Sequence, residues 1–282
     1  MDALMVAHKP PQISSNFFLS KLKRIYNVKK AGYSGTLDPF ARGCLIVGFG
    51  NHTRLFSFIQ KNPKVYEATL WLGVKSLSLD MENIVSIREV KKIEKQKIED
   101  ILASLKGKIS YTPPRYSAKK INGKRSYELA RSGIMLEPSV SIMEIFEIEL
   151  LCYNHPYLSF RASVSEGSYI RSIGEIIAKE LGVDGALSSL ERISEGDIVA
   201  KAGETSFIDP LKVLKYPIIS DLSLQVRENL WLGRKFLLEN QKDGIYIANF
   251  EDFFSIIQIK EDGSVQYLLN RINKNVDFIK KT

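Results

Sequence analysis

A glycine-rich stretch, residues 31–43, places the strongest constraint on how this chain folds. It contains Gly32, Gly35 and Gly43, three of the chain's 18 glycines, and the apolar run Cys44–Val47 follows directly. Glycine adopts positive φ angles and lets the backbone approach a ligand closely. A short apolar run of this kind is typical of a buried strand. The stretch therefore predicts a tight loop beside a buried strand.

Asp38 supplies the carboxylate of this loop and stands directly before Pro39. Proline biases the preceding residue toward an extended or turn conformation. Taken by itself, the stretch favours an ordinary turn or cap role, which Asp before Pro commonly fills. The alternative is catalysis, because reactive side chains are often displayed on loops held by a rigid scaffold.

Strand-like and helix-like patterns follow one another along the chain without a regular strand–helix–strand alternation. Residue types and alternation predict strands over residues 3–7, 64–73, 139–151, 157–165 and 187–193. Apolar residues at helical spacing predict helices from Ser14 or Ser15 onward, over residues 91–105, and from Ser168 onward. This order is typical of a mixed α/β domain rather than a doubly wound parallel sheet.

The C-terminal part has a different character. Tyr216-Pro217 marks a boundary, so we expect two domains, residues 1–215 and residues 216–282. Strands are predicted over 244–248, 253–259 and 265–269, with a hairpin turn at 261–263. The second domain is therefore expected to be small and β-rich.

The charge balance predicts a polyanionic partner. The chain has 40 Lys and Arg against 32 Asp and Glu, a net charge of +8. A basic surface of this kind favours RNA or DNA, although it can also serve only solubility. Within residues 113–133, a basic loop carrying Tyr116 leads to a short helix that is expected to end at Gly133. Basic and aromatic residues interleaved in this way suit a nucleic-acid surface.

Several other chemistries are excluded. The three histidines and two cysteines lie far apart and lack metal-ligand spacing, so no zinc site is expected. Phosphate-binding, dinucleotide-binding and serine-hydrolase motifs are absent from the sequence. No apolar run is long enough to cross a membrane, and the N-terminus lacks the features of a signal peptide. The remaining possibility is chemistry by acid, tyrosine and arginine side chains on a polyanion, without a cofactor. The expected location is the cytoplasm.

Arg171 requires an anionic partner. Ser168 is expected to cap the helix, which places Arg171 in its first turn, where a cation opposes the helix dipole. The sequence leaves three candidates for the partner: Glu175 one turn on, a buried catalytic carboxylate, or a substrate phosphate.

Several motifs together resemble the bacterial tRNA pseudouridine synthase B family. They are Lys9-Pro10 followed by Ser14-Ser15, Gly35-Thr36-Leu37-Asp38-Pro39, Lys64-x-Tyr66, Pro114-Arg115-Tyr116-Ser117-Ala118, and Gly167-Ser168-Tyr169-Ile170-Arg171. They occur in the family's order and span most of residues 4–215, and together they favour the catalytic role of Asp38 over the turn role.

The resemblance implies a fold and an activity. The fold would be a mixed, largely antiparallel central sheet flanked by helices, with a reduced PUA-like RNA-binding domain at the C-terminus. The activity would be isomerisation of a uridine in the T loop of tRNA (position 55) to pseudouridine, by a monomer that needs no cofactor or metal. No redox step occurs when the N1–C1′ bond breaks, the base rotates and a C5–C1′ bond forms.

The resemblance also assigns residues. Asp38 would act as a nucleophile or abstract the 2′ proton, and the sequence does not choose between these routes. Arg171 would pair with Asp38, keep it ionised and orient it. Tyr66 would stack on the flipped uracil and assist proton transfer at C5. RNA or base contacts are expected from Tyr33, Tyr116, Ser117, Lys119, Lys120, Tyr169 and Leu190. For Leu190, a plain core role is the preferred interpretation.

The chain departs from the family pattern at three places. Tyr33 stands where the family usually has His, and His8 stands where the family usually has an acidic residue. The acid-rich turn after Gly73 is reduced to residues 77–80. Tyr33 lies on the Asp38 loop, and we expect it to line the cleft and to pack or stack there. We expect none of the three departures to touch Asp38, Tyr66 or Arg171.

Two rival functions remain open at this stage. A non-catalytic RNA-binding protein or RNA chaperone would bind tRNA without any dependence on Asp38. A glycosidic hydrolase would release free uracil and usually needs a second carboxylate near the first. No second acid lies within the Asp38 motif, which counts against the hydrolase.

Overall fold

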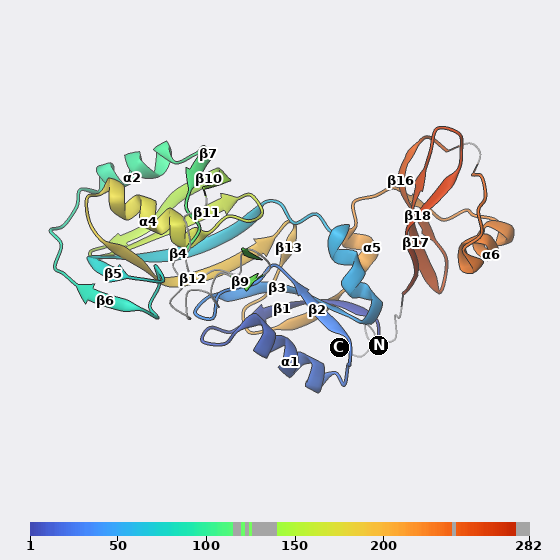
Figure 1. Cartoon of the computed structure of the whole chain (residues 1–282), viewed down its shortest axis with the longest axis horizontal. Coiled ribbons are helices and arrows are strands. Elements are labelled where there is room, and N and C mark those ends of the chain that lie inside the picture. Colours follow the sequence, from blue (N-terminus) through green and yellow to red (C-terminus); the bar gives the residue numbers. More distant parts are fainter. Residues whose placement is uncertain (115–119, 122–123, 126–139, 239–240, 275–282) are drawn as a thin grey trace.

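The structure is a computed structural model of the whole chain (Figure 1). It describes residues 1–114, 120–121, 124–125, 140–238 and 241–274. Within these ranges the predicted mixed α/β fold with a largely antiparallel central sheet is confirmed.

Ten strands of the described chain form the central sheet. Eight follow the order β14-β1-β3-β12-β4-β11-β10-β7, with β13 paired to β12 and β2 paired to β3. Their bounds are β1 Ala3–Lys9, β2 Ala31–Ser34, β3 Arg42–Phe49, β4 Lys64–Leu72, β7 Gly107–Tyr111, β10 Ser141–Asn154, β11 Tyr157–Val164, β12 Gly185–Glu195, β13 Ile198–Val199 and β14 Thr205–Ile208. The β3–β12 pair is parallel, whereas the other pairs of this sheet are antiparallel.

Residue alternation explains the central strand β4. Its residues alternate between buried and half-buried along Lys64–Leu72, which is the two-residue period of a strand with one face on the core. The strands predicted over 64–73, 139–151, 157–165 and 187–193 are thereby confirmed, with shifts of a few residues at their ends. Two further sheets have two strands each: β5 Val74–Ser76 pairs with β6 Ile84–Ile87, and β8 Lys120–Ile121 pairs with β9 Lys124–Arg125.

Two helices cover one part of the sheet. α2 (Lys95–Ser104) and α4 (Ile170–Glu180) share a core with apolar side chains of β4, β10, β11 and β12. Figure 1 shows both helices over the same end of the sheet. The prediction that Ser168 caps α4 is wrong. Tyr169 is the N-cap residue, while the Ser168 hydroxyl lies 3.2 Å from that of Ser165.

The other end of the sheet is covered on both faces. α1 (Ser15–Ile25), capped by Ser14 as predicted, packs on alternate residues of β1 and β3. The remaining residues of these strands pack with the 3-10 helix η1 (Gly50–Ser57) and with the C-terminal strands. A single apolar core therefore joins the large sheet to the C-terminal part.

The C-terminal part is a four-stranded sheet in the order β15-β16-β17-β18, at one end of the molecule in Figure 1. Its elements are β15 Ile218–Ile219, β16 Gly244–Asn249, β17 Phe253–Ile259 and β18 Val265–Asn273, preceded by α5 Pro210–Val213 and accompanied by α6 Leu224–Leu232. The three predicted strands and the turn at Gly263, which has φ 76°, are confirmed. The sequence did not predict α6, because its apolar residues are spread around the helix and only Leu230 is buried.

Candidate active site

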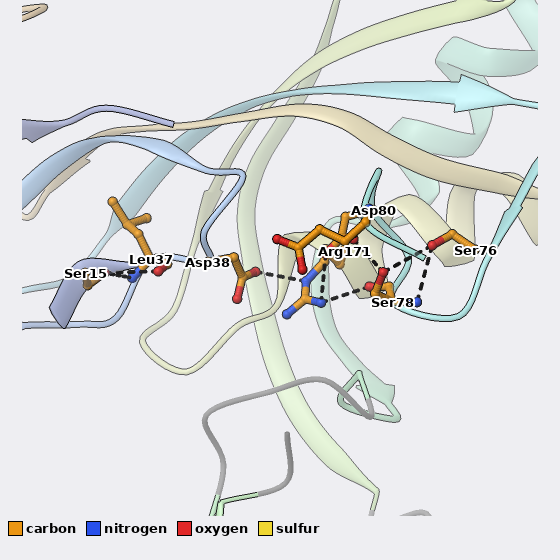
Figure 2. A network of polar contacts seen from close by, with 8 residues as sticks. Ser15, Leu37, Asp38, Ser76, Ser78, Asp80 and Arg171 are labelled. Atoms are coloured by element: carbon orange, nitrogen blue, oxygen red, sulfur yellow. Dashed lines mark hydrogen bonds and ion pairs between the residues drawn. The ribbon is translucent and has the colours of Figure 1, made fainter. Parts of the chain in front are cut away.

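The loop that carries Asp38 connects β2 to β3 and is fixed at several points. The Ser15 hydroxyl donates to the carbonyl of Leu37 and accepts from its amide, both at 3.0 Å (Figure 2). The buried Lys9 ammonium donates to the Pro39 carbonyl at 3.3 Å. Gly43, the second residue of β3, has φ +107°, and a Cβ there would lie 2.3 Å from the backbone carbonyl oxygen of Arg192. The loop therefore depends on that glycine and holds Asp38 in a defined place.

Arg171 contacts Asp38 directly. Its Nε lies 2.9 Å from the Asp38 carboxylate, and the Arg171 side chain is only 2% exposed (Figure 2). Of the three candidate partners, the structure selects the carboxylate of the Asp38 loop, because Glu175 instead pairs with Lys179 at 3.1 Å. The position of Arg171 at the start of α4 is thus matched by a negative charge from a distant loop.

A second carboxylate, Asp80, holds the other side of Arg171. The Arg171 Nη1 lies 3.2 Å from Asp80 and donates to the Ser78 carbonyl at 2.8 Å. The Ser78 hydroxyl donates to Asp80 at 2.5 Å, and the Glu82 amide donates to it at 3.0 Å. Asp80 is therefore buried in a fully organised turn that follows β5.

This contact corrects the expectation that the turn at residues 77–80 does not touch the candidate catalytic residues. The turn reaches Arg171 through both a side chain and a backbone carbonyl. The acid in this turn was visible in the sequence, but its partner lies far away along the chain, so no local pattern linked the two. Asp80 is thus a residue of this site to which sequence reasoning assigned no role.

The two carboxylates differ in their exposure to solvent. The Asp38 side chain is 29% exposed, whereas that of Asp80 is 4% exposed. Desolvation raises the pKa of Asp38 above its usual value of 3.8, and the Arg171 charge opposes this rise. The charge of Asp80 adds to the rise. Asp38 is thus the carboxylate of this network that faces the cleft, and Arg171 favours its ionised form against burial.

Asp38 and Arg171 line a cleft with a volume of about 530 Å³. Tyr66 on β4 forms part of its wall and is 7% exposed. Burial raises the pKa of the Tyr66 phenol, so the hydroxyl stays protonated near neutral pH. The cleft thereby combines a carboxylate, a guanidinium and an aromatic ring with a neutral hydroxyl, as expected from the sequence.

The predicted RNA-contact residues are distributed unevenly. Tyr169 and Leu190 line the cleft, and Leu190 also belongs to the buried core, in keeping with the preferred core interpretation. Tyr33 is not found among the described residues that line the cleft. Its hydroxyl donates to Asn16 at 3.1 Å, and its ring packs on the α1 side of the sheet.

Four predicted contacts fall on the segment after residue 114. Tyr116, Ser117 and Lys119 lie outside the described residues, and Lys120 is described only as backbone in β8. The short helix that was expected to end at Gly133 lies outside the described residues as well.

The cleft also contains charged residues to which sequence reasoning assigned no role. Arg192 of β12 lines it on the same side as Leu190, and Lys64 and Glu166 line it with a separation of 3.7 Å between their charged atoms. Strand alternation could have identified Arg192, because residues two apart in a strand share one face.

Comparisons with known proteins show which family the chain is similar to. Residues 23–170 match the family model described as TruB family pseudouridylate synthase, N-terminal domain. Among the relatives are tRNA pseudouridine synthase B of Helicobacter hepaticus, 54% identical over 99% of this chain and 98% of the relative, and that of Campylobacter concisus, 49% identical over 97% and 100%. Both are therefore similar to this chain along nearly its entire length.

Solved structures show the same fold. The chain resembles one in an H/ACA RNP bound to a substrate RNA containing 2'-deoxyuridine, with a TM-score of 0.67 at 18% identity over 97% of this chain and 86% of that one. A similar match, with a TM-score of 0.65 at 17% identity over 97% and 87%, is the archaeal box H/ACA sRNP Nop10-Cbf5 complex. The family match and the relatives at about half identity show that this chain belongs to the TruB family of pseudouridylate synthases.

Proposed function

We propose that this enzyme converts the T-loop uridine of tRNA (position 55) to pseudouridine, with Asp38 as the reacting carboxylate. The observation that carries the proposal is the ion pair between Asp38 and Arg171 at 2.9 Å in the wall of the cleft. Relatives named tRNA pseudouridine synthase B support tRNA as the substrate. The net charge of +8 suits this polyanion.

The reaction rearranges bonds without a net change in atoms. The N1–C1′ bond breaks, the uracil rotates in the cleft, and C5 bonds to C1′. C5 then loses its proton and N1 gains one, so neither an oxidant nor a reductant is required. Asp38 either attacks C1′ as a nucleophile or removes the 2′ proton, and both roles need its ionised form.

Arg171 and Tyr66 have separate roles in this proposal. Arg171 orients the Asp38 carboxylate and stabilises its charge. Tyr66 offers its ring to the flipped base and its hydroxyl to proton transfer at C5. Tyr169, in the same cleft, offers a second aromatic surface.

The C-terminal sheet is proposed to bind RNA. We assign residues 1–215 to the catalytic domain and residues 216–282 to a small PUA-like domain. Trp231 is 46% exposed, and the Arg271 guanidinium lies 5.8 Å from the centre of its ring. An exposed aromatic ring beside a cation suits nucleic-acid binding. The enzyme is proposed to act as a monomer in the cytoplasm; among the described helices none has the length and apolarity to span a membrane.

The test is incubation with an unmodified tRNA transcript, followed by mapping of pseudouridine. Pseudouridine at the T-loop position, lost in Asp38→Asn, is the expected result. Free uracil would instead identify the hydrolase. The hydrolase is kept as an alternative because the site has further carboxylates: Glu166 lines the cleft, and Asp80 lies behind Arg171. Binding of tRNA without any modified base would contradict the proposal and favour the non-catalytic alternative.

A further inference from the structure

A second buried ion cluster lies in the floor of the cleft, separate from the Asp38–Arg171 pair. It consists of Lys64 on β4, Arg192 and Glu195 on β12, and Ser34 on β2. The side chains of Lys64, Arg192 and Glu195 are 7%, 1% and 0% exposed. Burying charges costs free energy, and an ion pair in such a place is weak evidence for stability alone.

Glu195 is the centre of this cluster. The Ser34 hydroxyl donates to one Glu195 oxygen at 2.5 Å, and the Lys64 ammonium lies 3.8 Å from the same oxygen. The other oxygen lies 3.4 Å from the Arg192 Nη2. Glu195 thus brings a negative charge to two buried cations, Lys64 at one oxygen and Arg192 at the other.

Arg192 connects the two ends of the Asp38 loop. Its Nη2 donates to the Gly35 carbonyl at 2.9 Å, and its Nε donates to the Cys44 carbonyl at 2.8 Å. Gly35 has φ +61°, and a Cβ there would lie 3.0 Å from both Arg192 Nη1 and Lys64 Nζ. The guanidinium therefore occupies the space that a side chain at Gly35 would need.

Arg192 also lies beside Tyr66. The two residues are directly paired in the antiparallel β4–β12 register, so their side chains share one face of the sheet, and both line the cleft. A guanidinium only donates hydrogen bonds, so toward Arg192 the Tyr66 hydroxyl can act only as an acceptor. The hydroxyl hydrogen of Tyr66 is then available as a donor to a base in the cleft.

We propose that Arg192 and Glu195 are positioning residues for the reaction: Arg192 turns the Tyr66 hydroxyl into a hydrogen-bond donor toward the substrate base and fixes it relative to the Asp38 loop, and Glu195 holds Arg192 in place. This inference rests on the proposed function, because it assumes that Tyr66 faces the reacting uracil. It gives the buried cluster a role in the rate of the chemical step.

The test measures single-turnover pseudouridine formation at saturating tRNA, together with the tRNA Kd and the melting temperature. Arg192→Lys should lower the rate roughly 100-fold, the order expected when a reacting group is misplaced by about 1 Å, and leave the Kd near that of the wild type. Glu195→Gln keeps the shape of the side chain and should also lower the rate, but by less than Arg192→Lys does.

A double-mutant cycle distinguishes positioning from plain folding. In a Tyr66→Phe background, Arg192→Lys should cause a much smaller rate loss than in the wild type, because the hydroxyl it orients is absent. Glu191→Gln is the matched control. Glu191 is also on β12 and pairs with Arg42 at 2.6 Å, but it lies on the opposite face of the strand from Arg192, and its substitution should leave the rate unchanged.

The outcomes separate this inference from the proposed function. A wild-type enzyme that leaves the tRNA transcript unmodified would overturn the proposed function. An active wild type with fully additive losses for Arg192→Lys and Tyr66→Phe would overturn the positioning role alone. A Glu195→Gln variant with a lower melting temperature and an unchanged rate would also overturn the positioning role.

Discussion

The buried Asp80 carboxylate lies 3.2 Å from the Arg171 Nη1 and holds this side of the guanidinium. The Arg171 Nε is left to pair with Asp38, the carboxylate that faces the cleft. The two aspartates therefore have different surroundings and different roles. Asp80 is fixed by the Ser78 hydroxyl and by a backbone amide, and it anchors the cation. Asp38 is more exposed and is available to a substrate.

Asp38→Asn should abolish isomerisation while tRNA binding stays within a small factor of the wild type. An amide can neither attack C1′ nor accept the 2′ proton, yet it has nearly the same size as the carboxylate. Mapping of pseudouridine and a filter-binding Kd measure the two effects. Near-normal turnover by this variant would rule out Asp38 as the reacting group.

Asp80→Ala should reduce both activity and stability. Removing one partner of a buried pair leaves an uncompensated charge, which costs about 3–5 kcal/mol when no other group replaces it. Arg171 keeps its contacts with Asp38 and the Ser78 carbonyl, so we expect the loss of stability to fall below that range. Urea unfolding and single-turnover rates measure the change. The Asp80→Asn variant should retain more activity and more stability than Asp80→Ala. An Asp80→Ala variant with the activity and stability of the wild type would refute the anchoring role.

The acid limb of the pH–rate profile should lie above the usual Asp value of 3.8. Burial raises the pKa of Asp38, so protonation removes the reacting carboxylate at a higher pH than for an exposed aspartate. The negative charge of Asp80 contributes to this rise. Neutralising it in Asp80→Asn should therefore move the acid limb to lower pH. A shift to higher pH would contradict this assignment of charges.

Tyr66→Phe should bind tRNA almost as well as the wild type and turn over slowly, whereas Tyr66→Leu should lose binding as well. The first change removes only the hydroxyl, and the second also removes the aromatic ring. Rates at saturating tRNA and Kd values separate the two contributions. Full activity of Tyr66→Phe would reduce the residue to a stacking surface.

Trp231→Ala and Arg271→Gln should weaken tRNA binding without changing the rate at saturation. Arg271→Gln should also reduce the salt dependence of log K by about one if it contacts a phosphate. Point variants are preferable to deletion of residues 217–282, because the tail shares an apolar core with Val6 and Ile46 of the large sheet. Unchanged affinity in both variants would show that this face is not an RNA surface.

The sequence by itself determined the mixed α/β class, most of the strands and the motifs that carry Asp38, Tyr66 and Arg171. Alternation along residues 64–73 and apolar runs such as Cys44–Val47 report burial directly, since each depends only on neighbouring residues. The Asp38, Tyr66 and Arg171 motifs are likewise short and local. For the same reason α6 was missed: its apolar residues follow no single face, and its buried Leu230 packs in one cluster with residues of the C-terminal sheet.

The tertiary structure decided which charges meet. Asp80 reaches Arg171 only because the turn after β5 folds back beside the start of α4. Arg192 lies beneath the Asp38 loop and beside Tyr66 because β12 is inserted between β3 and β4, an order that connects segments far apart in the chain. The Ser168 cap was wrong because the Ser168 hydroxyl lies against that of Ser165 instead. Pairings of this kind depend on strand order and on the packing of distant turns, which no local pattern of residues encodes.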